Sequence, residues 1–233
     1  MKRVFLAFGL AAFALASAFG LAGDGHVRTE ERQAAGFRAI EMSGVGSLTV
    51  TRTSSFRVTV TLDGNLLPIY ESRVEGGVLH LGFKSSPVSG LTKLAVAVSL
   101  PDLDALSISG ACEASLGGAF GGKSLRLEMS GAGAIAGRLA YQSIRIGLSG
   151  SGHMRLEGKV DSLEVRASGA GEIDAAALQS REAVADLSGA CRLSLRASDS
   201  LDISASGASS VTYYGDPKLK AKTSGVSSVK KAG

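Results

Sequence analysis

Several residue types that mark common functional classes are scarce in this sequence of 233 residues. It has no tryptophan, 5% aromatic residues, three histidines and two cysteines. Nucleic-acid-binding surfaces combine basic with aromatic side chains, so the scarcity of aromatics argues against a nucleic-acid partner. The histidines His26, His80 and His153 lack the clustered spacing of zinc ligands. We therefore expect no metal, no cofactor and no nucleic acid.

Catalytic signatures are also missing, with one apparent exception. The chain has no Gly-x-Ser-x-Gly motif, in which a nucleophilic serine occupies a tight turn. Residues 117–124 read Gly-Gly-Ala-Phe-Gly-Gly-Lys-Ser and match the phosphate-binding loop, but that loop must open a helix. Here the pattern from Leu125 to Met129 alternates as a strand. A glycine-rich turn is the favoured interpretation, and no catalytic residue is predicted.

The N-terminus has the pattern of a secretory signal peptide. Met1–Arg3 is basic, Val4–Phe19 is apolar, and Ala16-Ser17-Ala18 is a small-x-small cleavage site. A retained membrane anchor is the alternative, but the apolar run is short for crossing a bilayer. We assign residues 1–18, extending at most to 22, to a signal peptide and expect no transmembrane segment in the mature chain.

The positive charge of the mature chain is concentrated at its C-terminus. Without Lys2 and Arg3, 23 basic and 21 acidic residues remain. Five of those lysines and one aspartate fall in residues 216–233, which leaves 18 basic and 20 acidic residues in 19–215. We assign 216–233 to a basic C-terminal tail, which either protects an open end of the fold or touches an anionic envelope surface.

A repeat with a period near twenty residues organises the sequence. The motif Ser-Gly-Ala-Gly at 130–133 recurs with small changes at 149–152, 168–171 and 188–191. Looser copies begin at Ser43, Ser109, Ser206 and Ser224. From Ser109 onward the copies start 21, 19, 19, 20, 18 and 18 residues apart. A regular period of this length is the signature of a repeat architecture.

The residues around each copy alternate between apolar and polar. Before Ser149, for example, Ile144, Ile146 and Leu148 alternate with Arg145 and Gly147. Such alternation indicates a strand with one buried face. Each repeat predicts a strand, a corner of small residues and a second strand, with both corner glycines inward, where they permit the bend and a positive φ. The predicted structural corner residues are Gly44, Gly46, Gly110, Gly131, Gly133, Gly150, Gly152, Gly169, Gly171, Gly189, Gly207 and Gly225.

Stacking these repeats places leucine on leucine and glycine on glycine, which predicts an all-β parallel solenoid. The variable spacing and the lack of a hexapeptide favour a right-handed β-helix over a left-handed one. The alternative is an antiparallel sandwich with glycine-rich turns. We expect a single β-helix domain over 23–233, in which a hairpin-rich insertion at 54–100 caps the first turns.

Outward charges on neighbouring turns are expected to pair, since adjacent strands lie about 4.8 Å apart. The expected pairs are Arg145–Glu164 and Arg166–Asp186. A groove for carbohydrate or carboxylate ligands is one interpretation of this face. The mixed signs favour the other, a solvated ladder whose pairs each contribute under about 1 kcal/mol.

The two cysteines occupy the same corner position, three residues after Ser109 and Ser188. Four turns separate them, or roughly 19 Å at about 4.8 Å per turn. A disulfide needs its Cα atoms closer than about 7 Å. Although an exported chain with two cysteines suggests a disulfide, we therefore predict that Cys112 and Cys191 are free, buried thiols.

Several segments together resemble a known family. They are Ser43-Gly44-Val45-Gly46, Leu66–Phe83, Leu94–Leu106 with its Leu-Pro-Asp-Leu, the serial Ser-Gly-Ala-Gly corners, and Tyr214-Gly215-Asp216-Pro217. On these the chain resembles the head GIN domain family, described as auto-transporter adhesin heads and otherwise as a domain of unknown function. The resemblance covers essentially the whole mature chain. It implies a secreted or surface-exposed bacterial protein with a right-handed β-helix, and it brings no catalytic residue.

The sequence therefore favours a non-catalytic envelope or secreted protein. Its role would be that of an adhesin-like or structural interaction module in the periplasm, outside the cell or on the outer surface, with a protein or glycan partner. The rival is a β-helix polysaccharide lyase or hydrolase. Such enzymes need clustered carboxylates or a carboxylate-bound calcium on one face, and the outward positions never place two acids on adjacent turns.

Export should be accompanied by cleavage near Ala18, because the small-x-small site follows directly on the apolar run. N-terminal sequencing of periplasmic or extracellular material tests this prediction. An exported protein that still begins with Met1 would contradict it.

Overall fold

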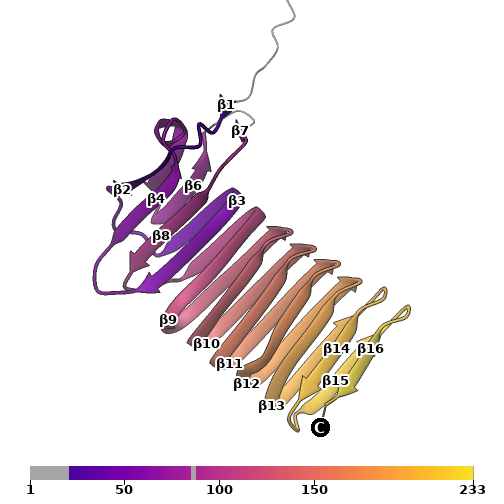
Figure 1. Cartoon of the computed structure of the whole chain (residues 1–233). Helices are drawn as coiled ribbons and strands as arrows, with labels where there is room; N and C mark the ends of the chain where they lie inside the picture. The colour runs from indigo at the N-terminus through magenta and orange to yellow at the C-terminus, as the bar shows by residue number, and fades with distance from the viewer. Residues whose placement is uncertain (1–20, 85–87, 233) are drawn as a thin grey trace, which may run out of the picture.

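The computed structural model describes residues 21–84 and 88–232, so the predicted signal peptide lies outside the described residues. Figure 1 shows a row of stacked strands that continues from a smaller N-terminal region. The elements are β1 (Leu21–Ala22), β2 (Val27–Arg32), β3 (Ala39–Arg52), β4 (Arg57–Asp63), the 3-10 helix η1 (Leu67–Ile69), β5 (Tyr70–Glu75), β6 (Val78–Phe83), β7 (Val88–Ser89), β8 (Leu94–Leu100), β9 (Ala105–Gly131), β10 (Ala134–Gly150), β11 (His153–Gly169), β12 (Glu172–Gly189), β13 (Arg192–Ala205), β14 (Ser210–Tyr214), β15 (Lys218–Thr223) and β16 (Ser228–Lys231).

From β10 to β12 each long strand forms about one turn of a solenoid, while β9, with 27 residues, extends over more than one turn. β10 pairs in parallel with β9 on one side and with β11 on the other, along nearly its whole length. Within β10, residues 134–141 and 143–150 form two paired stretches, with Gln142 unpaired at the bend between them. The predicted parallel β-solenoid is confirmed, and the antiparallel sandwich is wrong. The right-handed coiling stays a prediction.

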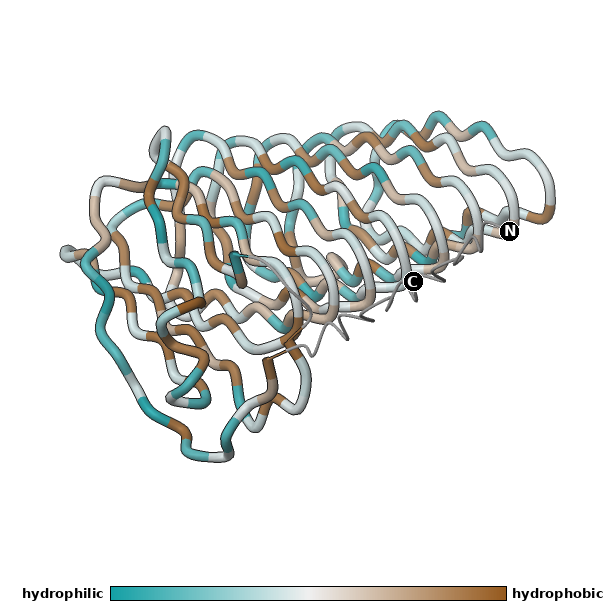
Figure 2. Tube along the Cα trace, turned by 90° about the horizontal axis from the view of Figure 1, so that it is seen from above, coloured by the Kyte–Doolittle hydropathy of each residue, from teal (hydrophilic) through white to brown (hydrophobic). Residues whose placement is uncertain are grey.

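The two stretches of successive turns build two facing sheets with a narrow apolar core between them. Along one sheet the inward side chains of successive turns stack on each other, as Leu127, Ile146 and Val165 do, and all three are buried. Figure 2 shows hydrophobic and hydrophilic residues alternating along the chain within the turns. Most of the buried side chains are branched or small, and Phe120 and Tyr141 are the large aromatics buried within the described turns from β9 onward.

The corner that joins the two sheets requires a glycine at its tip. Gly150 has a φ of 117°, and a Cβ built on it would lie 2.5 Å from the carbonyl oxygen of Gly131 on the preceding turn. Any other residue would therefore be strained in its backbone and would clash with its neighbour. The same position on the other turns also has a positive φ: Gly44, Gly110, Gly131, Gly169, Gly189, Gly207 and Gly225.

The prediction that both corner glycines face inward is wrong for the first one. Gly150 is half-buried and Gly169 is exposed, whereas Gly152 and Gly171 are buried. At the tip the chain passes from one sheet to the other, so a Cβ there points along the stack at the preceding turn. Only the second position faces the core.

The second corner position, three residues after the corner serine, holds a small residue because side chains of the preceding turn fill the space beside it. A Cβ on Gly171 would lie 2.5 Å from Cδ2 of Leu148, and a Cβ on Gly152 would overlap Sδ of Met129. Gly46 and Gly133 occupy this position on earlier turns. Where the preceding turn offers the shorter Ala167, the position holds Cys191.

Cys112 and Cys191 are free and buried, as predicted. They belong to one column, in which backbone hydrogen bonds link the turns of Gly133, Gly152, Gly171 and Cys191. The Sγ of Cys112 lies 3.3 Å from the carbonyl oxygen of Gly44, and the Sγ of Cys191 lies 3.3 Å from that of Ser188. Burial raises the pKa of both thiols, which keeps them protonated and unreactive.

At the N-terminal end both sheets finish in antiparallel strands. One sheet continues from β3 through the parallel β8 to the antiparallel β4 and then β2. The other continues from β3 through the parallel β6 to the antiparallel β5. The strands β4, β5, β6 and β8 lie within the segment 54–100, for which the sequence predicts a hairpin-rich insertion.

Polar side chains hold this N-terminal region together. The buried Asp63 accepts hydrogen bonds from the backbone N–H groups of Thr92 and Gly25, each at 2.9 Å. Hydrogen bonding by the Thr92 side chain, together with these backbone bonds, lowers the pKa of the Asp63 carboxyl. Arg38 makes a two-pronged contact with Asp104, at 2.6 and 3.1 Å. Asp63 thus joins the end of β4 to the segments that precede β2 and β8, and Arg38 joins the segments that precede β3 and β9.

Among residues 88–232, the C-terminal end of the solenoid has no such cover. β14 and β15 lie on β13, and β16 lies on β14, all in parallel. The segment 216–233, assigned to a basic tail, thus contributes two strands to the last turn.

The tip glycines should tolerate no side chain. Gly150→Val and Gly169→Val are each expected to lower the free energy of unfolding by about 2 kcal/mol or more, through a forbidden φ and a clash with the preceding turn. Thermal melts followed by circular dichroism test this. Ser151→Ala, a change of the exposed neighbouring residue, is the control and should leave the melt nearly unchanged. Equal tolerance of all three would contradict the stacking.

Both thiols should be protected in the folded protein. Native protein treated with an alkylating reagent should remain unmodified at Cys112 and Cys191, because both are shielded and carry raised pKa values. After denaturation without reductant, mass spectrometry should find both alkylated. A bond between Cys112 and Cys191 in the native protein would contradict the register of the turns.

Candidate functional site

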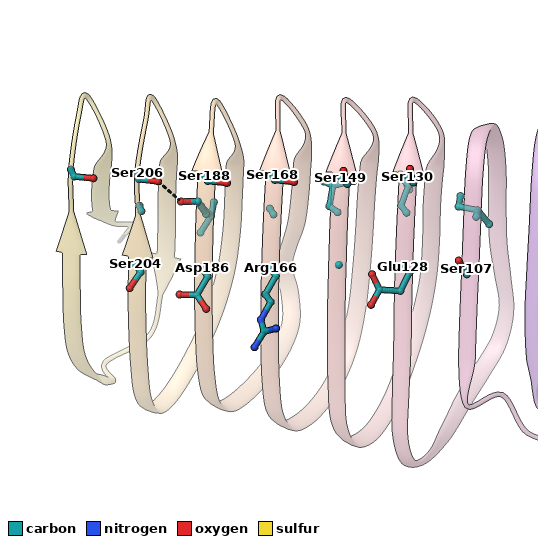
Figure 3. Close-up of a pocket in the computed structure, with 18 of the residues that line it drawn as sticks. Ser107, Glu128, Ser130, Ser149, Arg166, Ser168, Asp186, Ser188, Ser204 and Ser206 are labelled. Carbon is teal, nitrogen blue, oxygen red and sulfur yellow. Dashed lines mark hydrogen bonds between the residues drawn. The ribbon is translucent and has the colours of Figure 1, made fainter.

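A groove runs along the solenoid beside the corner tips, and we call it the serine trough. Its volume is about 640 Å³. One wall is a row of corner serines, which stack on one another in the register of the strands. Figure 3 shows these serines just below the tips, with a second row of outward residues parallel to them. The first row is Ser109, Ser130, Ser149, Ser168, Ser188, Ser206 and Ser224, and the second is Ser107, Glu128, Gly147, Arg166, Asp186, Ser204 and Lys222.

The trough is hollow because most of its side chains are short. A serine on every turn adds only a hydroxyl group above the sheet. Gly147 opens a gap in the second row, and the carboxylate of Glu128 leans across the space that a Cβ on Gly147 would fill. The result is a row of hydroxyl donors and acceptors, spaced at about 4.8 Å, the distance between strands, in a lining that is otherwise largely apolar.

The charges of the trough are mixed, and its two acids lie far apart. Glu128 and Asp186 are separated by the turns of Gly147 and Arg166, which makes three steps. At about 4.8 Å per step their backbones are roughly 14 Å apart. The paired carboxylates of glycosidases lie about 5–9.5 Å apart. The trough therefore lacks the acid pair of a glycosidase, and its chemistry is that of hydrogen bonding.

One of the two predicted ion pairs is confirmed. Nε of Arg145 lies 3.1 Å from a carboxylate oxygen of Glu164 on the next turn. The pairing of Arg166 with Asp186 is wrong, although the two are neighbours in register. Arg166 instead reaches Glu164, two residues back on its own strand, at 2.9 Å. Glu164 thus joins both arginines, and Asp186 is left facing the trough.

At its N-terminal end the trough leads into a second, charged pocket of about 250 Å³, which shares Ser107 and Ser109 with it. Nδ1 of His80 lies 3.1 Å from the Glu41 carboxylate, and Nε of Arg73 lies 2.8 Å from that of Glu71. These residues come from β3, β5 and β6.

Sequence reasoning missed this pocket because it treated Leu66–Phe83 as part of an insertion. The alternation in Val78–Phe83 was the available signal. In the structure this segment is β6, which lies beside β3 as a further parallel strand, so that His80 stands next to Glu41.

The glycine-rich segment 117–124 lies within the long strand β9, and Leu125–Met129 continues the same strand. This segment is followed by strand and not by a helix, so its match to the phosphate-binding loop reflects a glycine-rich bend between the two sheets. The predicted corner glycines line the edge beside the trough and contribute backbone only.

Within residues 21–84 and 88–232, no three His, Cys, Asp or Glu side chains come together as a metal site would require. The same part of the chain contains no helix long and apolar enough to cross a membrane.

A family model described as "Putative auto-transporter adhesin, head GIN domain" matches residues 36–217. Among solved structures, a "putative adhesin" from Bacteroides fragilis NCTC 9343 aligns with a TM-score of 0.86 at 22% identity, over 91% of this chain and 100% of that one. A "putative lipid binding protein" from Parabacteroides distasonis ATCC 8503 aligns with a TM-score of 0.79 at 22% identity, over 91% and 99%. A "putative adhesin" from Parabacteroides merdae ATCC 43184 gives 0.76 at 21% identity, again over 91% and 99%.

No curated protein matches the chain. At these identities the structural matches establish a shared fold.

Proposed function

Because the chain belongs to the head GIN domain family, we propose that it is a non-catalytic, adhesin-like interaction module, exported to the cell envelope or beyond. Its contact surface is the serine trough. The family's adhesin description and the signal-peptide pattern of residues 1–18 support the location, and the geometry of the trough supports the role.

The observation that carries the proposal is the continuity of the trough. Six of its seven corner serines are exposed, and Ser206 is half-buried. The serines of the inner turns, Ser130, Ser149, Ser168 and Ser188, have a neighbouring turn on each side, so little conformational entropy is lost when a ligand binds. A rigid strip of hydroxyl groups suits an extended polar chain, a glycan or an extended peptide, that lies along the solenoid axis. It does not suit a compact ligand, which needs an enclosed pocket.

The polysaccharide lyase or hydrolase stays a rival with less support. Its reaction needs two carboxylates near one bond, and the acids of the trough are three turns apart. At the charged N-terminal pocket, Glu41 and Glu71 are each in contact with a basic residue. Release of oligosaccharides from acidic polysaccharides would favour the rival and contradict the proposal.

A glycan array, together with pull-down from envelope extract, tests the proposal and identifies the ligand class. The trough variant Ser149→Gln with Ser168→Gln places two longer side chains on adjacent turns of the serine row. It should lower the binding of any ligand found by at least about tenfold, because the added atoms fill the trough and displace the ligand.

The matched control is Ser115→Gln with Ala136→Gln. These two exposed residues lie next to each other on adjacent turns of the opposite sheet. The control should bind as the unchanged protein does. A loss in the control pair but not in the trough pair would move the contact to the other face and contradict the assignment to the trough.

A further inference from the structure

The C-terminal end of the solenoid exposes part of its apolar core. Leu219 occupies the inward position that Leu201 holds one turn earlier. Leu201 is 1% exposed, but Leu219 is 41% exposed because no further turn covers it. Ala221 follows on the same side of β15 and is also exposed. The end of the molecule is therefore an apolar patch of small area.

Val226 adds to this apolar surface. It stands at the third residue of the last corner, where the five preceding turns hold alanine or serine. Its side chain is 86% exposed, the highest value among the large hydrophobic residues described. A buried partner would explain an apolar residue here, and within the described residues the chain supplies none.

Lysines surround this patch. Lys218, Lys220 and Lys222 alternate along β15, Lys230 and Lys231 end β16, and all five are exposed. Asp216 is the single acid in this segment and is in contact with Lys231. Within the described residues, the other four lysines form no ion pair. We call the lysines together with Leu219 and Val226 the basic end.

The basic end repels a second copy of itself. The opposite end of a second copy fits poorly as well, because its acids already have partners. Glu30 and Glu31 contact Arg32 and Arg57, while Glu71 and Glu75 contact Arg73. Nucleic acid fits less well than lipid, since the most exposed large side chains of this end, Leu219 and Val226, are aliphatic, whereas the neighbouring Tyr213 and Tyr214 are half-buried and the Tyr214 ring is covered by Arg196.

We propose that the basic end docks on an anionic phospholipid bilayer, with the solenoid axis standing on the membrane surface. Lysines attract anionic headgroups, and each contributes favourably within a Debye length of the surface. Leu219 and Val226 enter the boundary between headgroups and acyl chains, as the apolar side of an interfacial segment does. The N-terminal region then points away from the membrane, and the trough extends along the axis between them.

This docking is independent of the ligand of the trough. It is tested by co-sedimentation of the protein, collected after export, with vesicles of phosphatidylcholine alone or of equal parts phosphatidylcholine and phosphatidylglycerol. Binding should be confined to the anionic vesicles and should weaken as salt is raised.

Lys218→Glu with Lys220→Glu and Lys230→Glu, three lysines outside the trough, should lower the partition coefficient by at least about tenfold, because lysines near an anionic surface act additively. The matched control is Lys84→Glu with Lys93→Glu and Lys123→Glu. It changes the net charge by the same amount at exposed sites away from the basic end, and it should keep most of the binding. Thermal melts of both variants show that each is folded.

Val226→Ser tests the apolar part, with Val184→Ser as its control, since Val184 is 47% exposed in the middle of the solenoid. Only Val226→Ser should weaken binding to anionic vesicles.

Equal binding to both kinds of vesicle, or an equal loss in the basic-end and control variants, would overturn the proposal. Binding to DNA without binding to vesicles, or self-association through this end, would also overturn it, because each would identify a different occupant.

Discussion

The fold depends on one line of backbone hydrogen bonds that passes from turn to turn over the corner tips. The N–H of Ser151 donates to the carbonyl oxygen of Gly131, and the N–H of Ala170 donates to that of Gly150. The bonds are short, at 2.8–2.9 Å, and no side chain fits between the two tips. Because the tips are fixed in this way, each corner serine stands directly above the next one. The trough is thus a by-product of the constraint that closes the turn.

Much of this architecture follows from the sequence because the physics is local and repeated. Alternation of Ile144, Ile146 and Leu148 with polar residues determines the buried face, and the shared corner position of Cys112 and Cys191 keeps their thiols apart. The errors occur where alternation stops describing geometry. At Gly150 the chain reverses between sheets, so counting residues no longer gives the direction of a Cβ. Arg166 has two acids within reach, and the sequence cannot rank a contact along the strand against one across it.

The N-terminal region was harder to predict because its contacts are not periodic. The pocket of Glu41 and His80 depends on β6 lying beside β3, and 35 intervening residues, from 43 to 77, give no register for that pairing. The same region explains why the two ends of the solenoid differ. Antiparallel strands and the buried Asp63 cover one end, whereas the other keeps its last turn open, with lysines as its main defence against pairing with another sheet edge. The two ends therefore meet the surroundings of the protein in different ways.

Each turn touches only the turn before it and the turn after it, so the molecule can change length without redesign of its core. Duplication of one segment of about nineteen residues, from one corner serine to the next, would add one complete layer. The layer would bring its own tip glycine, its own inward side chains and one more hydroxyl group in the trough. The number of contacts offered to a long ligand would rise with each added layer, and avidity with it, while the chemistry of every single contact stayed the same. Selection could thus adjust how strongly the protein holds a polymer by counting turns, without altering any side chain that touches it.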